Sequence, residues 1–225
     1  MNLEVISKNI SNKLKIELNL DEDKRSIIEY GVFAFFHMLI SILLVAIIGL
    51  VFNVMIEALI ISFTGAILRK FSGGAHASTP TNCAIVGVLI SVIPAYIIKH
   101  ISLNSNYIIF SGILLYIISF ILIYKLAPVD SPNKPIKKEA KIKRLKTGSI
   151  FIISMYMIFA VVNIGMYYVK NINFLLVYTT CIYIGVLWQV FTLTKCGHII
   201  VNKIDSFFII IFNMIGGRKN EKIKQ

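Results

Sequence analysis

Apolar residues along this chain gather in long blocks that are separated by short charged stretches. A surface helix of a soluble protein instead repeats its apolar positions about every 3.6 residues and carries polar residues on the other face. Blocks such as residues 40–52 contain no such alternation and are apolar on every side. Because such segments suit hydrocarbon better than water, the pattern predicts an all-α, polytopic integral membrane protein.

Six apolar segments are bounded by charges and turn residues. A helix that rises about 1.5 Å per residue needs about 20 residues to cross ~30 Å of hydrocarbon, and the longer segments meet this length. The second segment is the weakest, because it is short and contains Glu57. The predicted transmembrane helices cover residues 31–53, 54–68, 84–98, 106–124, 149–169 and 173–194.

Basic residues favour the cytoplasmic side of membrane proteins and so predict orientation. Six crossings from a cytoplasmic N-terminus put 21 of the 23 Lys and Arg inside and leave only Lys99 and Lys170 outside. Both termini are then cytoplasmic. The predicted organisation is a cytoplasmic amphipathic segment (1–26), a six-span domain (27–200) with cytoplasmic loops 69–83 and 125–148, and a cytoplasmic tail (201–225).

Composition supports the membrane class and excludes others. The chain is 57% hydrophobic with a net charge of +12, whereas soluble domains are roughly 45–50% apolar. A nucleic-acid-binding protein is also basic, but here the charges flank apolar segments, so we expect no nucleic acid partner. Residues 1–26 lack the pattern of a signal peptide and fit either a membrane-surface segment or a solvated terminus. The three cysteines contain no CxxC spacing, and we expect no metal or other cofactor.

The loop between the second and third segments contains both a histidine and a cysteine. A Cys83 thiolate is a nucleophile, and the His76 imidazole is a base that can take its proton and return it to a leaving amine. Gly73-Gly74 ends the preceding helix, so His76 lies on a flexible loop. The alternative interpretation is that Cys83 packs as a small apolar residue and His76 is solvated.

The sequence around Pro80 predicts where the next helix begins. Ser78 or Thr79 is a suitable N-cap, and Pro80 is favoured in the first turn. Cys83 would then lie at the end of that turn, near the positive end of the helix dipole. Asn82 and Ser72 are close in sequence and are candidates for a third catalytic residue.

Two separated stretches resemble the AgrB family of bacterial accessory gene regulators. The first runs from Arg69 to Cys83 through Gly73-Gly74 and His76, and the second is 127–136, which precedes a Lys-rich loop. The resemblance implies that His76 and Cys83 form a peptidase dyad and that Arg69, Gly73 and Gly74 support it.

The same resemblance implies a function in quorum sensing. Members of the family are thiol proteases of the bacterial cell membrane that remove the acidic C-terminal tail of an AgrD-like peptide precursor on the cytoplasmic side. The acyl-enzyme thioester is then resolved by a Cys or Ser of the peptide, which closes a thiolactone or lactone ring. A homodimer is compatible with the family. The alternative functions are a small peptide transporter or exporter and a non-enzymatic membrane scaffold.

Other polar residues have simpler interpretations. Basic residues between 134 and 146 follow the orientation rule and attract anionic lipids; Lys134, Lys137, Lys138 and Lys141 are also candidates for holding an acidic peptide tail. Cys196 and His198 diverge on a helix and are not expected to form a dyad. We expect Cys181 to serve packing. Glu29, His37 and Glu57 lie in or near spans, and His37–Glu57 is a candidate interhelical pair.

Overall fold

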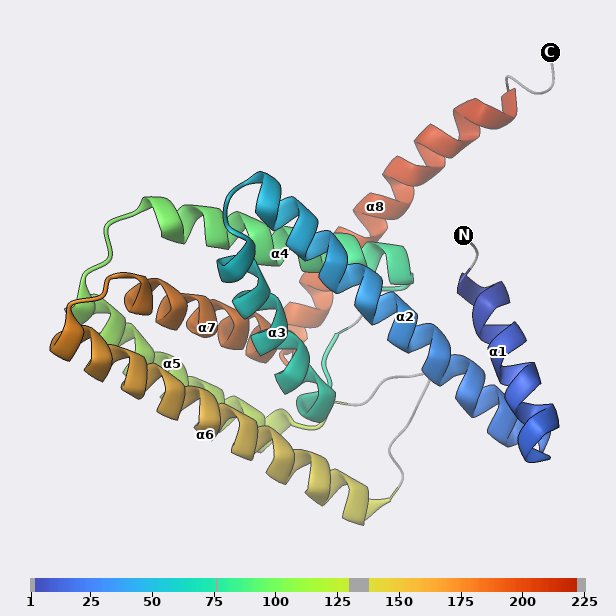
Figure 1. Ribbon diagram of the computed structural model, residues 1–225, viewed down its shortest axis with the longest axis horizontal. Helices are drawn as coiled ribbons and strands as arrows, with labels where there is room; N and C mark the ends of the chain where they lie inside the picture. Colours follow the sequence, from blue (N-terminus) through green and yellow to red (C-terminus); the bar gives the residue numbers. More distant parts are fainter. Residues whose placement is uncertain (1–2, 76, 130–137, 222–225) are drawn as a thin grey trace. The chain divides into compact units, whose positions relative to one another are not determined.

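A computed structural model describes residues 3–75, 77–129 and 138–221 of the chain, and the description below is limited to them. These residues form helices throughout, which confirms the all-α class (Figure 1). The helices are α1 (Leu3–Leu18), α2 (Glu22–Val51), α3 (Met55–Ser72), α4 (Pro80–His100), α5 (Ser105–Leu126), α6 (Glu139–Lys170), α7 (Phe174–Phe191) and α8 (Lys195–Glu221).

Five helices within the described residues are long and apolar enough to cross a membrane: α2, α4, α5, α6 and α7. The protein is therefore a polytopic membrane protein, as predicted. The second predicted segment forms α3, which is a helix but is not among these five, and it carries Glu57 near its start and Arg69 and Lys70 in its last turn. Its crossing of the membrane and the cytoplasmic position of both termini stay predictions.

Two helices begin earlier than the apolar segments that predicted them. The structure starts α2 at Glu22 rather than at 31, and α6 at Glu139 rather than at 149. Their first turns contain charged side chains, which keep a helical backbone without contributing apolar character. Apolar content therefore marks the hydrocarbon-facing part of a helix and not its ends.

The chain divides into two compact units, residues 1–44 and 45–225, and each is described by itself. The first unit joins α1 to the start of α2 through a turn at Asn19, which has φ +48°. Arg25 donates to Glu22 at 2.6 Å and to Glu29 at 2.5 Å. Glu29, one of the ionisable residues in or near a predicted span, therefore has an ion-pair partner. The described part of the predicted amphipathic segment is thus α1 and the start of α2, each with its own ionic contacts.

In the second unit, α7 is the central helix and contacts α3, α4, α5 and α6 (Figure 1). Leu176, Val186 and Cys181 on α7 are almost fully buried. Cys181 lies in an apolar cluster with Ala58 and Val92, which confirms its packing role. Burial of α7 within the bundle places its last turn where several helix ends meet.

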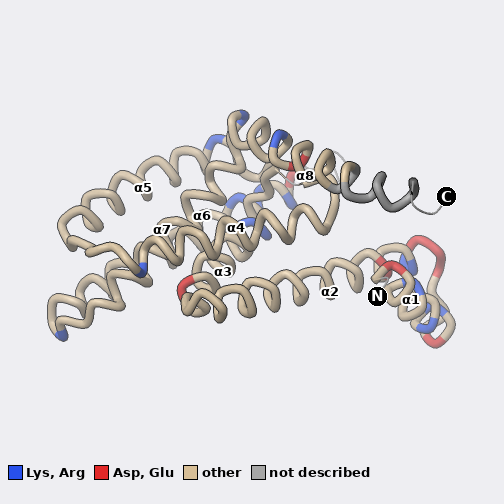
Figure 2. The backbone as a smooth tube through the Cα atoms, turned by 90° about the horizontal axis from the view of Figure 1, so that it is seen from above, with Lys and Arg blue, Asp and Glu red and all other residues tan. Residues whose placement is uncertain are grey.

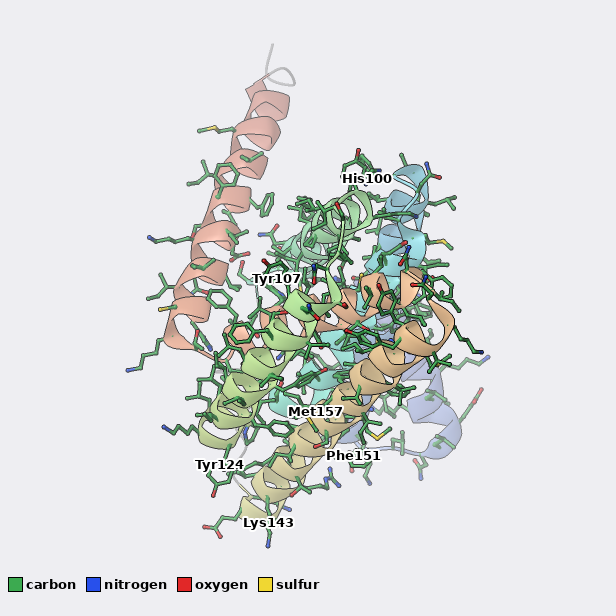
Figure 3. The ribbon with its side chains drawn as sticks, turned by 90° about the vertical axis from the view of Figure 1, so that its left-hand side faces the viewer. His100, Tyr107, Tyr124, Lys143, Phe151 and Met157 are labelled. Atoms are coloured by element: carbon green, nitrogen blue, oxygen red, sulfur yellow. The ribbon has the colours of Figure 1, made fainter. Side chains whose placement is uncertain are left out.

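Helices α3 to α7 of the second unit run in alternating directions, so that their ends lie at two opposite ends of this unit (Figure 1). At one end, Lys99 forms an ion pair with Glu57 at 3.3 Å, a partner for Glu57 that the sequence analysis did not predict. Figure 3 shows α5 and α6 side by side, with Tyr124 and Lys143 at the opposite end from His100. There the Lys146 ammonium lies 4.1 Å from the centre of the Tyr124 ring.

Lys and Arg lie near the ends of α5 and α6, and the middle of each helix carries none (Figure 2). Lys170 is in the last turn of α6, and Lys99 is in the last turn of α4. The level that contains the end of α3 and the start of α4 has Arg69, Lys70 and the basic first turns of α6. The side of the membrane on which each of these groups lies stays a prediction.

Candidate active site

Helix α4 begins as the sequence predicted. Thr79 is the N-cap with extended backbone (φ −118°, ψ 147°), and its hydroxyl oxygen accepts from the Asn82 N–H at 3.2 Å. Pro80 is the first helical residue. The Cys83 N–H donates to the Thr79 carbonyl at 3.1 Å, so Cys83 ends the first turn. Its thiol is free and half-buried, accessible enough to react.

The predicted base, His76, lies outside the described residues. The structure therefore describes the loop on both sides of it and the position of Cys83, while the His76–Cys83 dyad stays a prediction. The two glycines before it, Gly73 and Gly74, have φ +68° and +130°, conformations that side chains disfavour.

Arg69, in the last turn of α3, holds this loop. Its guanidinium is buried, donates from Nη2 to the carbonyl of Ala75, and interacts electrostatically with Cys83. No described residue accepts a hydrogen bond from its Nε. Arg69 was predicted from the sequence to support the dyad, and this role stays a prediction.

The end of α7 holds the same loop from the other side. Gln189 Nε2 donates to the Ser72 hydroxyl at 2.9 Å and to the Gly73 carbonyl at 2.7 Å. The Ala75 N–H donates to the Thr192 carbonyl at 3.0 Å. Gln189 and Thr192, the residue that follows α7, are each 1% exposed or less. Sequence reasoning missed Gln189, although a glutamine inside an apolar span is itself a signal, because buried amides need partners.

The two motifs that carried the family resemblance meet in space. The Val129 N–H donates to the Ser72 carbonyl at 2.9 Å, and Gly73 forms a short bridge with Val129. A Cβ atom added at Gly73 would collide with the Val129 carbonyl oxygen, and one at Gly74 would lie 2.6 Å from Thr192 Oγ1. Only glycine fits between these backbones. Ser72, a candidate third catalytic residue, has its hydroxyl bonded to Leu68 and Gln189.

Helix α8 contributes a carboxylate to the start of α4. Asn82 Nδ2 donates to Asp205 Oδ1 at 2.8 Å. Burial raises the pKa of the Asp205 carboxyl, but the interactions with Ser78 and Asn82 outweigh burial and hold the pKa below its usual value. Nothing catalytic was predicted beyond residue 200. Asn82, which with Ser72 was a predicted candidate for a third catalytic residue, is buried in this contact.

The basic residues form a separate, exposed group. Lys138 precedes α6 as its N-cap, and Lys141 lies in the first turn; both are exposed. Lys134 and Lys137 lie outside the described residues. Cys196 is exposed in the first turn of α8, where helical geometry points it away from His198, as expected. Among the described residues, no group of three His, Cys, Asp or Glu side chains is placed to hold a metal ion.

Comparison with known proteins settles the family. The model of the family described as accessory gene regulator B, AgrB, matches residues 7–193. The chain belongs to the AgrB family. An AgrB-like protein of Clostridium perfringens strain SM101 is 43% identical over 210 residues, which cover 91% of this chain and 97% of the relative.

More distant relatives are similar over a smaller part of the chain. The accessory gene regulator protein B of Staphylococcus intermedius is 29% identical over 145 residues, which cover 64% of this chain and 69% of that protein. No solved structure matches the chain. AgrB membership carries with it the general role of a membrane peptidase that processes an AgrD precursor.

Proposed function

We propose that this AgrB-family protein is a cysteine endopeptidase that cleaves the C-terminal tail from an AgrD-like precursor, with Cys83 as nucleophile and His76 as general base. The observation that carries the proposal is the position of Cys83: a half-exposed free cysteine at the first turn of α4, which interacts electrostatically with the guanidinium of Arg69. The thiolate of such a cysteine is the nucleophile that the reaction needs.

The reaction has two steps. In the first, His76 takes the thiol proton, and the Cys83 sulfur attacks the scissile carbonyl; the C–N bond then breaks, and the tail leaves as an amine that receives the proton from His76. In the second, an internal thiol or hydroxyl of the peptide attacks the thioester and closes the ring, and Cys83 regains its proton. Exclusion of water from the thioester favours ring closure over hydrolysis.

Arg69 has two roles in this proposal. It interacts electrostatically with the Cys83 side chain, and its hydrogen bond to the Ala75 carbonyl fixes the residue next to His76 in the chain. Gln189 and Thr192 hold the other side of the loop. The base is thereby carried by a loop whose flanking backbone is fixed at 72–75, while the nucleophile is carried by a helix.

The site belongs on the cytoplasmic side in this proposal. The level of the second unit that contains Cys83 also contains Arg69, Lys70 and the basic start of α6, and basic residues favour the cytoplasmic side. The exposed Lys138 and Lys141 are suited to an acidic peptide tail, and to anionic lipid headgroups when no peptide is bound.

Substitution of the dyad in purified, reconstituted protein tests the proposal. Cys83→Ser and His76→Ala should each lower precursor cleavage by about 10³-fold or more, with unchanged abundance in the membrane. Cys181→Ser and Cys196→Ser serve as matched controls and should keep cleavage, which is measured from the masses of the products. Cleavage at the wild-type rate by Cys83→Ser would overturn the assignment.

A further inference from the structure

One face of α8 connects the end of α7 to the start of α4. Gly197, Val201 and Asp205 follow one another at intervals of one helical turn, and all three are buried. A Cβ atom at Gly197 would lie 2.9 Å from the Thr192 Cα, so the face begins against the turn that holds the loop. It ends at Asp205, which accepts from Asn82 at 2.8 Å. The neighbouring residues Ile200 and Phe207 are exposed.

We propose that Asp205 is a positioning residue for Cys83: its carboxylate fixes the first turn of α4 and so sets the direction from which the thiolate attacks. This inference rests on the proposed function, because it assigns Asp205 a part in that reaction. Asn82 directly precedes Cys83 and is 2% exposed, and its side-chain amide donates a hydrogen bond to this carboxylate. Movement of this amide therefore moves the backbone that carries the nucleophile.

Three features make the contact strong enough for this task. The Asn82 amide donates to an ionised carboxylate, and hydrogen bonds to a charged acceptor are stronger than neutral ones. A negative charge is favourable at a helix N-terminus, where backbone N–H groups lack partners. Loss of the acceptor would leave the buried Asn82 amide without its partner, so the turn would shift to find another.

A substitution at Asp205 is expected to change the attack of Cys83 on the peptide rather than the binding of the peptide. Asp205 contacts α4 residues and not the exposed lysines before and within α6 that are proposed to hold the peptide tail. A displacement of the nucleophile by about 1 Å can lower a rate by up to about 100-fold. A change at Asp205 is therefore expected in kcat, with KM nearly constant.

Steady-state cleavage by Asp205→Leu, Asp205→Asn and Ser206→Ala tests the proposal in the full-length, reconstituted protein. Asp205→Leu is expected to lower kcat about tenfold or more with KM within about twofold. Asp205→Asn keeps an oxygen acceptor for Asn82 and is expected to recover kcat to within about threefold of wild type. Ser206→Ala is the matched control, because Ser206 is exposed and its hydroxyl bonds Asn202 of its own helix.

Asn82→Ala provides a second route if Asp205→Leu does not fold. It removes the donor instead of the acceptor and is expected to lower kcat similarly; combined with Asp205→Asn it should add little, because the two residues share one contact. Wild-type kcat in both Asp205→Leu and Asn82→Ala would overturn the proposal. So would an Asp205→Asn variant as slow as Asp205→Leu, or a loss expressed in KM alone.

Hydrogen–deuterium exchange separates this inference from the proposed function. Asp205→Leu should speed amide exchange in residues 81–84 relative to wild type and Ser206→Ala, whether or not any variant cleaves the precursor. Faster exchange together with an inactive wild-type protein would contradict the proposed function and support the contact. Unchanged exchange and unchanged kcat in an active protein would contradict only the role of Asp205.

Discussion

The loop 72–75 and the basic start of α6 are both parts of the candidate site, but they are built in opposite ways. The loop is held by buried polar contacts from three other segments: Arg69 of α3, Gln189 of α7 and Val129 after α5. The described lysines before and within α6, from Lys138 to Lys143, are exposed to solvent. The backbone of the loop is therefore fixed in one conformation, whereas the lysine side chains are free to adopt several.

This difference separates chemistry from recognition. A nucleophile and its base need fixed geometry, which buried hydrogen bonds supply. An acidic peptide tail is attracted over several ångströms by charges that need no single geometry, and that attraction is weakened by salt. Variants of the loop should therefore lose kcat, whereas variants of the lysines should raise KM.

The largest effect is expected at Gly73. In Gly73→Ala the new methyl group collides with the Val129 carbonyl, and φ +68° is unfavourable for alanine; such backbone strain costs about 1–3 kcal/mol. Cleavage should fall by about 100-fold or more. Gly87→Ala is the matched control, since nothing lies within 4 Å of its added Cβ. Equal activity of the two variants in the precursor assay would show that the close approach of Val129 is unimportant.

A smaller loss is expected at Gln189. Gln189→Leu keeps the volume but leaves the Gly73 carbonyl without its donor, at a cost of about 1–3 kcal/mol. Precursor cleavage should fall by about tenfold, mainly in kcat. Thr180→Val on the same helix removes a hydroxyl that bonds only its own helix and should stay near wild type. A Gln189→Leu enzyme with normal kcat would contradict the role of α7 in holding the loop.

Part of this site could be predicted from the sequence because its signals are local. The N-cap at Thr79, the proline after it and the two glycines act on neighbouring backbone, so their effects were predicted correctly. Gln189, Thr192 and Asp205 act through contacts with residues more than 100 positions away, and no local pattern identifies the partner. Likewise, helical extent was underestimated at α2 and α6, because hydropathy reports the surroundings of a helix and not its backbone.

The smallest effect is expected in the lysines around the start of α6. Replacement of Lys137, Lys138, Lys141 and Lys143 by Gln should raise KM by about threefold to tenfold with little change in kcat, because ground state and transition state lose the same attraction. Added salt should reproduce the effect in wild type. Since the change also removes orientation signals, accessibility of residue 140 to a membrane-impermeant label must first match wild type. An unchanged KM would restrict these lysines to topology and lipid contact.

The central claim is that Cys83 carries the acyl group of the cleaved peptide. A precursor whose internal Cys or Ser is replaced by Ala cannot close its ring, so the thioester should accumulate. After acid quenching and proteolysis, mass spectrometry should find the N-terminal part of the precursor on the fragment that contains Cys83, and hydroxylamine should release it. Accumulation on Cys196, or tail cleavage without any adduct on Cys83 at times when product is still forming, would contradict the account.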